Sequence, residues 1–293
     1  MPDRTRRTRV LIVGCGDIGL RIAAALVPAL RLMALTSSPT RCELLRAHGV
    51  QPLLGNLDDP QTLTRLAGLA DRIIYLAPPH SDGATDIRCL AFLRAISRRS
   101  PPVRLVYAST SGVYGDCGGA WIDETQPLKA TTPRAMRRVD AEQQVRLLGR
   151  RLTTSVSILR IPGIYAPDRP DVTPRERLLA GTPVLLAQDD VYTNHIHADD
   201  LARACIAALW RGRSQRVYHV SDDTELKLGD YMDLAADLYK LPRPPRLDRA
   251  ELQKQISPMR LSFMAESRRL RNARMKRELR VTLRYPTVRQ GLR

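Results

Sequence analysis

The segment with the clearest chemical meaning is VLIVGCGDIG, in which Gly14, Gly16 and Gly19 follow an apolar run with the spacing Gly-x-Gly-x-x-Gly. A strand, a tight turn and a helix in this order form the pyrophosphate-binding unit of dinucleotide folds. The first glycine allows the turn, the second lets the backbone approach the pyrophosphate, and the third lets the helix pack on the strand. Free N–H groups and the helix dipole would bind the phosphates. We therefore predict a dinucleotide site, with a tight turn that binds nothing as the less favoured alternative.

The residues about twenty positions further on bear on the choice of coenzyme. A carboxylate usually stands there to bind the ribose hydroxyls of NAD. This chain has ALTSSPTR instead, which offers hydroxyls and a guanidinium but no acid. Such a set suits a 2′-phosphate, so we predict NADP, with NAD as the alternative; a solvated Arg41 would weaken this preference. The predicted contacts are Thr36, Ser37, Ser38 and Arg41.

Three arginines, Arg134, Arg137 and Arg138, crowd the start of a predicted helix in ATTPRAMRRVDAEQQ. A threonine can cap this helix, and Pro133 suits its first position. A helix N-terminus carries partial positive charge, so cations in its first turns are mildly unfavourable. The arginines either point into water, steady the ribose and phosphates of the coenzyme, or clamp a carboxylate or phosphate of a substrate. We favour the last two together, because bidentate arginine suits such anions.

Other chemistry-bearing residues give weaker signals. His195 and His197 lie two apart on a predicted strand near Asp199 and Asp200, but no further ligand cluster completes a known type of metal site, and we predict no metal. The run 109–111 lacks the Gly-x-Ser-x-Gly turn that would mark a nucleophile. The five cysteines are scattered, which is typical of free thiols in a reducing compartment.

Short apolar runs alternate with helical patterns through the first half of the chain. This alternation predicts an α/β fold, a Rossmann-type doubly wound parallel sheet covered by helices on both faces. The carboxyl ends of such strands share one edge, where ligands bind. The expected strands are residues 10–13, 32–36, 50–54, 72–77, 103–109 and 156–161, and the expected helices are 17–30, 40–48, 60–69, 84–99 and 133–149.

The second half of the chain lacks this regular alternation, and proline-rich segments separate isolated strand and helix patterns. We expect a dinucleotide-binding domain over residues 1–165, to which 195–222 contribute, and a smaller C-terminal substrate lobe over 166–293. The basic tail RRLRNARMKRELRVTLRYP has apolar residues at loosely helical spacing. This spacing predicts a helix that packs against the protein.

The composition is ordinary for a folded domain, with 43% hydrophobic and 26% charged residues, but the net charge is +17. Only five of the 47 basic residues are lysine, and the arginines are spread along the chain. Aromatic residues make up 4% of the chain, which is poor support for base stacking, so nucleic acid binding is unfavoured. No apolar run is long enough for a signal-peptide core or a membrane span, which favours a cytoplasmic protein without membrane attachment.

Several segments together resemble the NAD-dependent epimerase/dehydratase group of the extended and atypical short-chain dehydrogenase/reductases. GCGDIG fits the glycine loop of that group, GNLDD its adenine-contacting segment, and YLAPP the segment that lines the coenzyme after the fourth strand. VYASTSGVYGD is similar to the active-site strand, and ILRIPGIYAPDR to the loop beside the nicotinamide. The match covers nearly the whole chain. It adds these expected coenzyme contacts: Asp17, Ile18, Asn56, Leu57, Leu76, Ala77, Pro78, Pro162 and Ile164.

The resemblance also implies catalytic positions, which that family fills with a serine or threonine and a Tyr-x-x-x-Lys pair. Thr110 falls at the first position, whereas the pair falls on Arg134 and Arg138, so both of its members are replaced. A guanidinium holds its proton and has no acceptor, so Arg134 cannot take or return a substrate proton. Arg138 would keep the positive charge that the lysine provides in that family, but on a planar guanidinium group. The remaining acid/base candidates are His80, Tyr114, Asp123, Glu124 and Tyr165.

These residues lead to three functional hypotheses. The first is an NADP(H)-binding oxidoreductase or epimerase/dehydratase-like enzyme acting on a small polar substrate, which is anionic if the arginines bind it. The second is a non-catalytic NADP-sensing or regulatory protein with the same fold. The third is a nucleic-acid-binding member of the family. The resemblance favours a monomer or a homodimer.

Overall fold

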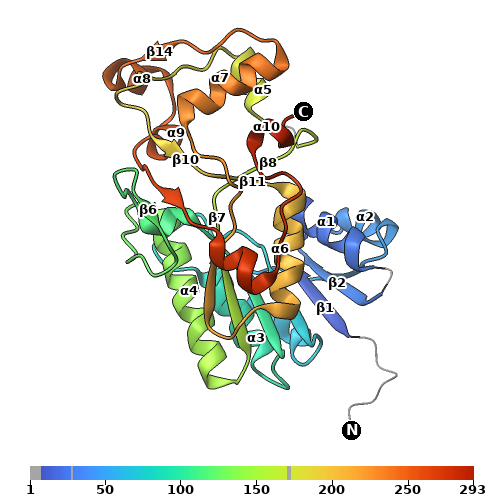
Figure 1. Cartoon of the computed structure of the whole chain (residues 1–293). Coiled ribbons are helices and arrows are strands. Elements are labelled where there is room, and N and C mark those ends of the chain that lie inside the picture. The colour runs from blue at the N-terminus through green and yellow to red at the C-terminus, as the bar shows by residue number, and fades with distance from the viewer. Residues whose placement is uncertain (1–7, 28, 170–172) are drawn as a thin grey trace.

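The computed structural model describes residues 8–27, 29–169 and 173–293. A seven-stranded sheet with the strand order β12-β7-β5-β4-β1-β2-β3 forms its centre (Figure 1). All neighbours in this sheet pair in parallel, so the carboxyl ends of the strands share one edge and the predicted Rossmann-type fold is confirmed. The strands are β1 (Arg9–Val13), β2 (Arg31–Thr36), β3 (Gln51–Leu54), β4 (Arg72–Tyr75), β5 (Arg104–Thr110), β7 (Ser155–Ile161) and β12 (Arg216–His219).

Helices cover both faces of this sheet (Figure 1). One face carries α1 (Asp17–Leu26), α2 (Arg41–Ala47) and α6 (Ala198–Arg211). The other carries α3 (Ile87–Ile96), α4 (Pro133–Arg151) and the 3₁₀ helix η1 (Pro60–Leu66), where an α-helix was expected.

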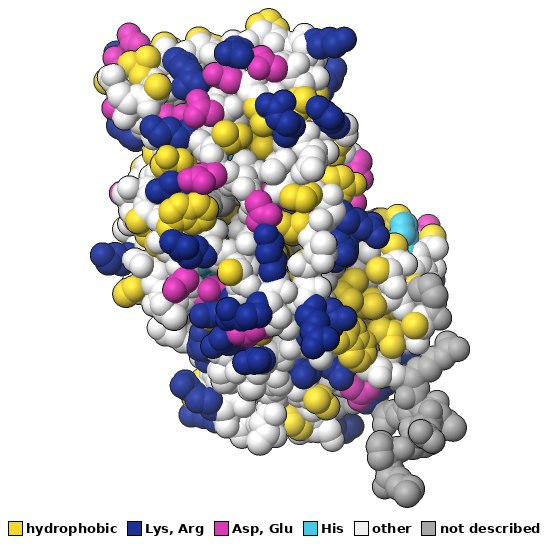
Figure 2. All heavy atoms as spheres, in the orientation of Figure 1, with side chains coloured by type: hydrophobic (Ala, Val, Ile, Leu, Met, Phe, Trp, Pro, Cys, Tyr) yellow, Lys and Arg dark blue, Asp and Glu magenta, His cyan; other side chains and the backbone are white. Residues whose placement is uncertain are grey.

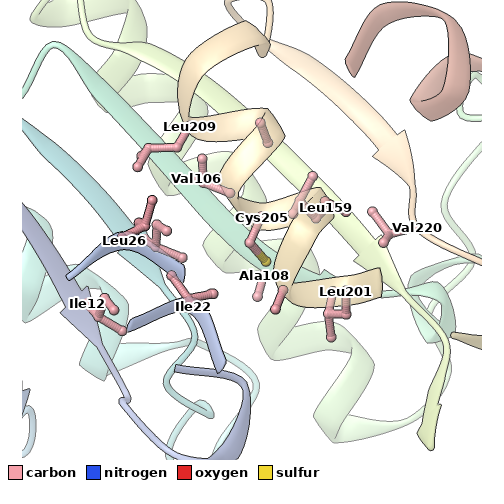
Figure 3. Close-up of a cluster of buried hydrophobic side chains, with 14 of the residues drawn as sticks. Ile12, Ile22, Leu26, Val106, Ala108, Leu159, Leu201, Cys205, Leu209 and Val220 are labelled. Carbon is pink, nitrogen blue, oxygen red and sulfur yellow. The ribbon is translucent and has the colours of Figure 1, made fainter. Parts of the chain in front are cut away.

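The strands are buried on both sides because successive side chains enter two different hydrophobic clusters. Ile12 of β1 lies in one cluster with Ile22 and Leu26 of α1 and Leu209 of α6, as Figure 3 shows. The neighbouring Leu11 lies in the opposite cluster, together with residues of α3 and α4. Burial on both sides explains why these strands are continuously hydrophobic rather than alternating.

A third hydrophobic cluster forms the core of a smaller lobe, seen above the sheet in Figure 1. The strands β8 (Gly163–Tyr165) and β11 (His195–His197) pair in parallel between this lobe and the sheet. The predicted domain boundary at residue 165 stays a prediction. The short elements of this part are α5 (Pro174–Leu179), β9 (Val184–Leu185), β10 (Tyr192–Thr193), β13 (Leu226–Lys227), α7 (Leu228–Tyr239), β14 (Arg246–Leu247), α8 (Arg249–Gln255), α9 (Pro258–Phe263) and α10 (Val288–Gly291).

The C-terminal tail packs against the sheet domain. Met275 and Leu279 are fully buried in the cluster that also contains α6. Residues 273–279 are helical, with a π-type turn over Met275–Leu279, and Arg280 follows in the left-handed conformation with φ 55°. The helix expected over the tail is thus limited to this stretch. The residues before this turn form β15 (Arg269–Leu270), which pairs with β6 (Trp121–Ile122).

A buried ion pair fixes α4 to the sheet. Arg160 of β7 donates from Nε and Nη2 to the two carboxylate oxygens of Glu142, at 3.1 and 2.7 Å. The Ser109 hydroxyl, from β5, donates to the same carboxylate at 2.6 Å. Burial lowers the pKa of Arg160, but its hydrogen bonds to Glu142 outweigh that effect and raise the pKa overall. Because Glu142 lies one turn after Arg138, this pair holds the first turns of α4 near the ends of β5 and β7.

Glu142→Gln should lower the free energy of unfolding by about 3 kcal/mol or more, because it leaves the buried Arg160 guanidinium without its counter-charge. Urea denaturation followed by circular dichroism measures this change. The control is Asp237→Asn, which removes the partner of an exposed guanidinium, that of Arg243. That control should leave the urea midpoint unchanged. A Glu142→Gln protein as stable as the wild type would contradict the proposed anchoring of α4.

Candidate active site

Three glycines shape the turn between β1 and α1 in different ways. Gly14 has a φ of 83°, and a Cβ at this position would lie 2.5 Å from the backbone nitrogen of Ala77. At Gly19 a Cβ would lie 2.9 Å from the Cys15 sulfur, so α1 packs closely on the turn. At Gly16, apart from its neighbours in the chain, no atom of the described residues lies within 4 Å of the Cβ position. The backbone at the start of α1 therefore borders open space, where its N–H groups are available to an anion.

A cavity of about 630 Å³ extends from this turn along the carboxyl edge of the sheet. β2 and β5 lie on opposite sides of β1 in the sheet. The residues that follow these two strands therefore lie at the two ends of the cavity. Gly19 and Ser38 are the two predicted coenzyme contacts that do not line it. The predicted residues that do line it are Gly14, Gly16, Asp17, Ile18, Thr36, Ser37, Arg41, Asn56, Leu57, Leu76, Ala77, Pro78, Thr110, Arg138, Pro162 and Ile164.

The charged side chains of this cavity are mostly arginines. Arg41 donates from Nη2 to the carbonyl oxygen of Cys15 at 2.8 Å, so its guanidinium lies against the glycine turn. Among the described residues, the carboxylates in the wall are those of Asp17 and Asp58. Asp58 accepts two hydrogen bonds from Arg88, at 2.6 and 2.7 Å, and this bonding lowers the pKa of its carboxyl group. The wall therefore favours an anionic ligand.

Two of these arginines, Arg88 and Arg169, were not singled out from the sequence. Arg88 lies in the first turn of α3, and Arg169 follows β8 in the segment IYAPDR. The segment containing Arg169 resembles the loop beside the nicotinamide, which is the signal that could have identified it. Arg88 has no comparable signal, because its approach depends on how α3 packs.

The arginines at the start of α4 have different surroundings. Arg138 donates from Nη1 to the carbonyl oxygen of Ala108 at 2.9 Å and to the hydroxyl of Tyr107 at 3.0 Å, so it lies across the end of β5. Arg137 is buried and donates to the carbonyl oxygen of Gly83 at 2.6 Å. The interpretation that all three arginines point into water is therefore wrong for Arg137. Arg138 is only partly exposed.

A second cavity, of about 690 Å³, adjoins the first and shares Thr110 and Arg138 with it. Arg134 lines the second cavity, with its guanidinium carbon 4.4 Å from the centre of the Phe263 ring. The described residues place one carboxylate in this wall, Glu266, and it is ion-paired at 2.8 Å. The arginines of the wall are Arg134, Arg138, Arg169, Arg177 and Arg268.

The acid/base candidates named from the sequence do not reach these cavities with their titratable atoms. The Tyr114 hydroxyl accepts a hydrogen bond from Arg160 at 2.7 Å, and burial raises the pKa of Tyr114 to about 12. Tyr165 lines the second cavity, but its hydroxyl donates to the carbonyl oxygen of Thr287 at 3.4 Å. The candidates that line neither cavity are His80, Asp123 and Glu124, together with Tyr114.

His195 and His197 belong to the packing between the sheet and the smaller lobe. Both rings meet the Tyr165 ring edge to face, with centroid distances of 6.1 and 5.4 Å. Burial lowers the pKa of both histidines, to about 3 for His195. In the described part of the chain, no group of three or more His, Cys, Asp or Glu side chains could hold a metal ion.

Basic residues are distributed over the surface. On the face shown in Figure 2, Lys and Arg side chains occur on both the sheet domain and the smaller lobe, interspersed with Asp and Glu. Several are paired, as Arg216 is with Glu278 and Lys276 with Asp223, each at 2.6 Å. This face lacks the single basic stripe that is typical of nucleic acid binding. None of the described helices has the length and apolar character needed to span a membrane.

Residues 10–221 match the family model of the NAD dependent epimerase/dehydratase family. The chain belongs to this family. The resemblance inferred from the sequence motifs is therefore confirmed. A conserved protein of unknown function from Silicibacter pomeroyi shares 32% identity, with a TM-score of 0.83 over 97% of this chain and 96% of that one.

Other solved structures of this fold are more distant in sequence. UDP-glucose 4-epimerase from Thermotoga maritima, solved with UDP-glucose, is 16% identical, with a TM-score of 0.80 over 97% and 96% of the two chains. A dTDP-glucose 4,6-dehydratase double mutant from Streptomyces venezuelae, solved with NAD, is 21% identical, with a TM-score of 0.77 over 97% and 94%. At these identities the likeness shows the fold alone. No curated protein sequence matched the chain.

Gly16→Val should reduce dinucleotide affinity at least about tenfold while lowering the thermal midpoint less than Gly14→Ala does. Gly16 has a φ of −83° with a ψ of −148°, which costs a non-glycine residue some backbone strain, but the added side chain would enter the open space at the start of α1 rather than meet backbone. Calorimetric titration and thermal unfolding measure the two effects. Gly14→Ala is the contrasting variant and should unfold at a lower temperature, because its Cβ meets backbone. Undiminished affinity in Gly16→Val would contradict the position of the site.

Proposed function

We propose that the protein is an NADP(H)-binding oxidoreductase or epimerase/dehydratase-like enzyme that acts on a small polar, anionic substrate. The observation that carries this proposal is the pair of adjoining cavities, which meet at Thr110 and Arg138. One cavity begins at a glycine turn suited to a diphosphate, and the other has a cationic wall. Family membership supports the redox chemistry, since relatives of this fold were solved with NAD.

The residues of the first cavity fit a phosphorylated dinucleotide. The start of α1 would bind the diphosphate, because Gly16 leaves its amides accessible. Thr36, Ser37 and Arg41 would hold a 2′-phosphate at the β2 end, where this stretch of sequence contains no acid. The nicotinamide end would then lie near Arg138, at the junction with the second cavity. The bound coenzyme would supply hydride transfer at this junction.

Thr110 is suited to bind the reacting oxygen of a substrate. Its hydroxyl oxygen accepts a hydrogen bond from the backbone N–H of Gly112 at 3.2 Å, which leaves the hydroxyl proton available to a second acceptor. We propose that Arg134 and Arg138 stand at the Tyr and Lys positions of the family. Arg138 would then orient the coenzyme or substrate, and Arg134 would pair with a carboxylate or phosphate of the substrate.

A non-catalytic NADP(H) sensor is the second candidate. The observation that favours it is that guanidinium groups cannot exchange protons with a substrate at neutral pH. Such a protein would bind the coenzyme with the same residues but turn over no substrate. The distribution of charge in Figure 2 gives no similar support to the third hypothesis, nucleic acid binding.

Arg41→Ala should weaken NADP binding by about tenfold or more and change NAD binding much less, because only NADP carries the 2′-phosphate. Titration calorimetry with each coenzyme measures the difference. Arg46→Ala removes an exposed arginine of the same helix outside the cavity and should leave both affinities unchanged. Equal losses for NADP and NAD in Arg41→Ala would refute the assigned coenzyme preference.

Thr110→Val should lower the rate of coenzyme oxidation or reduction by about a hundredfold, because it removes a hydrogen-bond donor to the reacting oxygen. The assay is a screen of carbonyl compounds and sugar nucleotides with the wild-type protein, followed by kinetics of the variant on any substrate found. Coenzyme affinity should stay within about threefold, which shows that the fold is retained. Full activity in the variant would contradict the role of Thr110, and no turnover in the whole screen would favour the sensor.

A further inference from the structure

The coenzyme cavity contains an acidic residue where a diphosphate is expected. Asp17 is the first residue of α1, directly after Gly16, and its side chain is partly exposed in the cavity wall. An acid in the first turn suits the helix dipole. The same carboxylate repels a phosphate bound to the amides of that turn unless a cation compensates it. The surroundings of Asp17 therefore decide whether this turn can bind a diphosphate.

Arg169 provides a cation at this point. Its Nε lies 2.8 Å from Oδ2 of Asp17, and its Nη1 donates to the carbonyl oxygen of Ile164 at 3.1 Å. These two contacts leave the Nη2 donors of Arg169 without a partner among the described residues. Arg169 lines both cavities, so it stands where the coenzyme site and the cationic second cavity meet.

A second arginine, Arg21, pairs with Asp168, the residue next to Arg169, and lines neither cavity. Arg21, one turn after Asp17 on α1, pairs with Asp168 at 2.7 Å and with Asp199 of α6 at 2.5 Å. It also reaches Asp17 at 3.0 Å. The chain at 168–169 is thus tied to α1 and α6, which limits how far Arg169 can move from the glycine turn.

We infer that Arg169 is a ligand of the coenzyme diphosphate and that Asp17 positions its guanidinium. This inference rests on the proposed coenzyme binding. It adds to that site a residue that belongs neither to the glycine motif nor to the proposed 2′-phosphate contacts. Arg169 would compensate the charge of Asp17 and donate from Nη2 to a phosphate oxygen. Because NADP and NAD share the diphosphate, Arg169 contributes equally to both, unlike a ligand of the 2′-phosphate.

A double-mutant cycle tests the inference, with Kd for NADP and for NAD measured by titration calorimetry. Arg169→Ala should weaken the binding of both coenzymes by the same factor, about tenfold or more, because it removes a cation and leaves Asp17 facing the phosphates with Arg21 as its remaining partner among the described residues. Asp17→Asn should weaken the binding of both coenzymes by about two- to fivefold, less than Arg169→Ala does, because it frees the Arg169 guanidinium but also removes a negative charge beside the phosphates. Asp17→Asn/Arg169→Ala should bind at least about threefold more tightly than Arg169→Ala alone. Thermal unfolding of each variant reports whether the fold is retained.

The control is Arg175→Ala, which removes an exposed arginine of α5 outside both cavities and should leave both affinities unchanged. Wild-type affinity in Arg169→Ala would overturn this inference alone and leave the proposed function intact. A loss confined to NADP would place Arg169 at the 2′-phosphate and also overturn it. A double variant no better than Arg169→Ala would refute the pairing with Asp17. A wild-type protein that binds neither coenzyme would overturn the proposed function together with this inference.

Discussion

The site depends on the close approach of the turn after β1 to the end of β4. Gly14 comes so near to Ala77 that no side chain fits between the two backbones. The positive φ of Gly14 then directs the chain into α1, and Gly16 leaves the start of that helix open. A parallel sheet brings these strand ends to one edge, so a single tight turn places helix amides beside the residues that follow β2, β4 and β5. The rest of the coenzyme cavity is built around that turn.

The second constraint is electrostatic. Arginines from α2, α3, α4, the segment 169–177 and the segment before β15 converge on the two cavities, and the described carboxylates in their walls are paired with arginine. The buried pair of Arg160 and Glu142 fixes the helix that carries Arg134 and Arg138. At the N-terminal end of α4, Arg138 lies at the junction of the cavities and Arg134 in the wall of the second one, whereas Arg137 is buried and donates to the carbonyl oxygen of Gly83. The carbonyl oxygens of Gly83 and Ala108 accept hydrogen bonds from Arg137 and Arg138, which stabilises cations where the helix dipole alone would disfavour them.

The parallel sheet could be predicted because its strands are buried on both faces and are therefore continuously apolar. The strand expected over 72–77 ends at Tyr75, since Leu76 and Ala77 leave the sheet to contact the glycine turn and line the cavity. The short helices of the smaller lobe, such as α5 and α8, were not predicted, because tertiary packing rather than a repeating pattern stabilises them. The tail illustrates the same limit, since its apolar residues are buried while its backbone is mostly not helical.

The site could be predicted from the sequence to about the same extent as the fold. The glycine motif and its strand–turn–helix context indicated the diphosphate position, and family resemblance indicated most of the cavity wall. The sequence did not reveal Arg88 or Arg169, because each reaches the cavity through contacts between distant segments: Arg88 with Asp58 and Arg169 with Asp17. Nor could it show that the hydroxyls of Tyr114 and Tyr165 point into the protein interior.

A crystal structure of the protein with NADP would test the proposed coenzyme site most sharply. In that structure we expect the diphosphate on the amides at the start of α1, the 2′-phosphate beside Arg41 and the nicotinamide near Arg138. A coenzyme bound elsewhere, or another part of the chain filling the crevice at Gly16, would contradict the account.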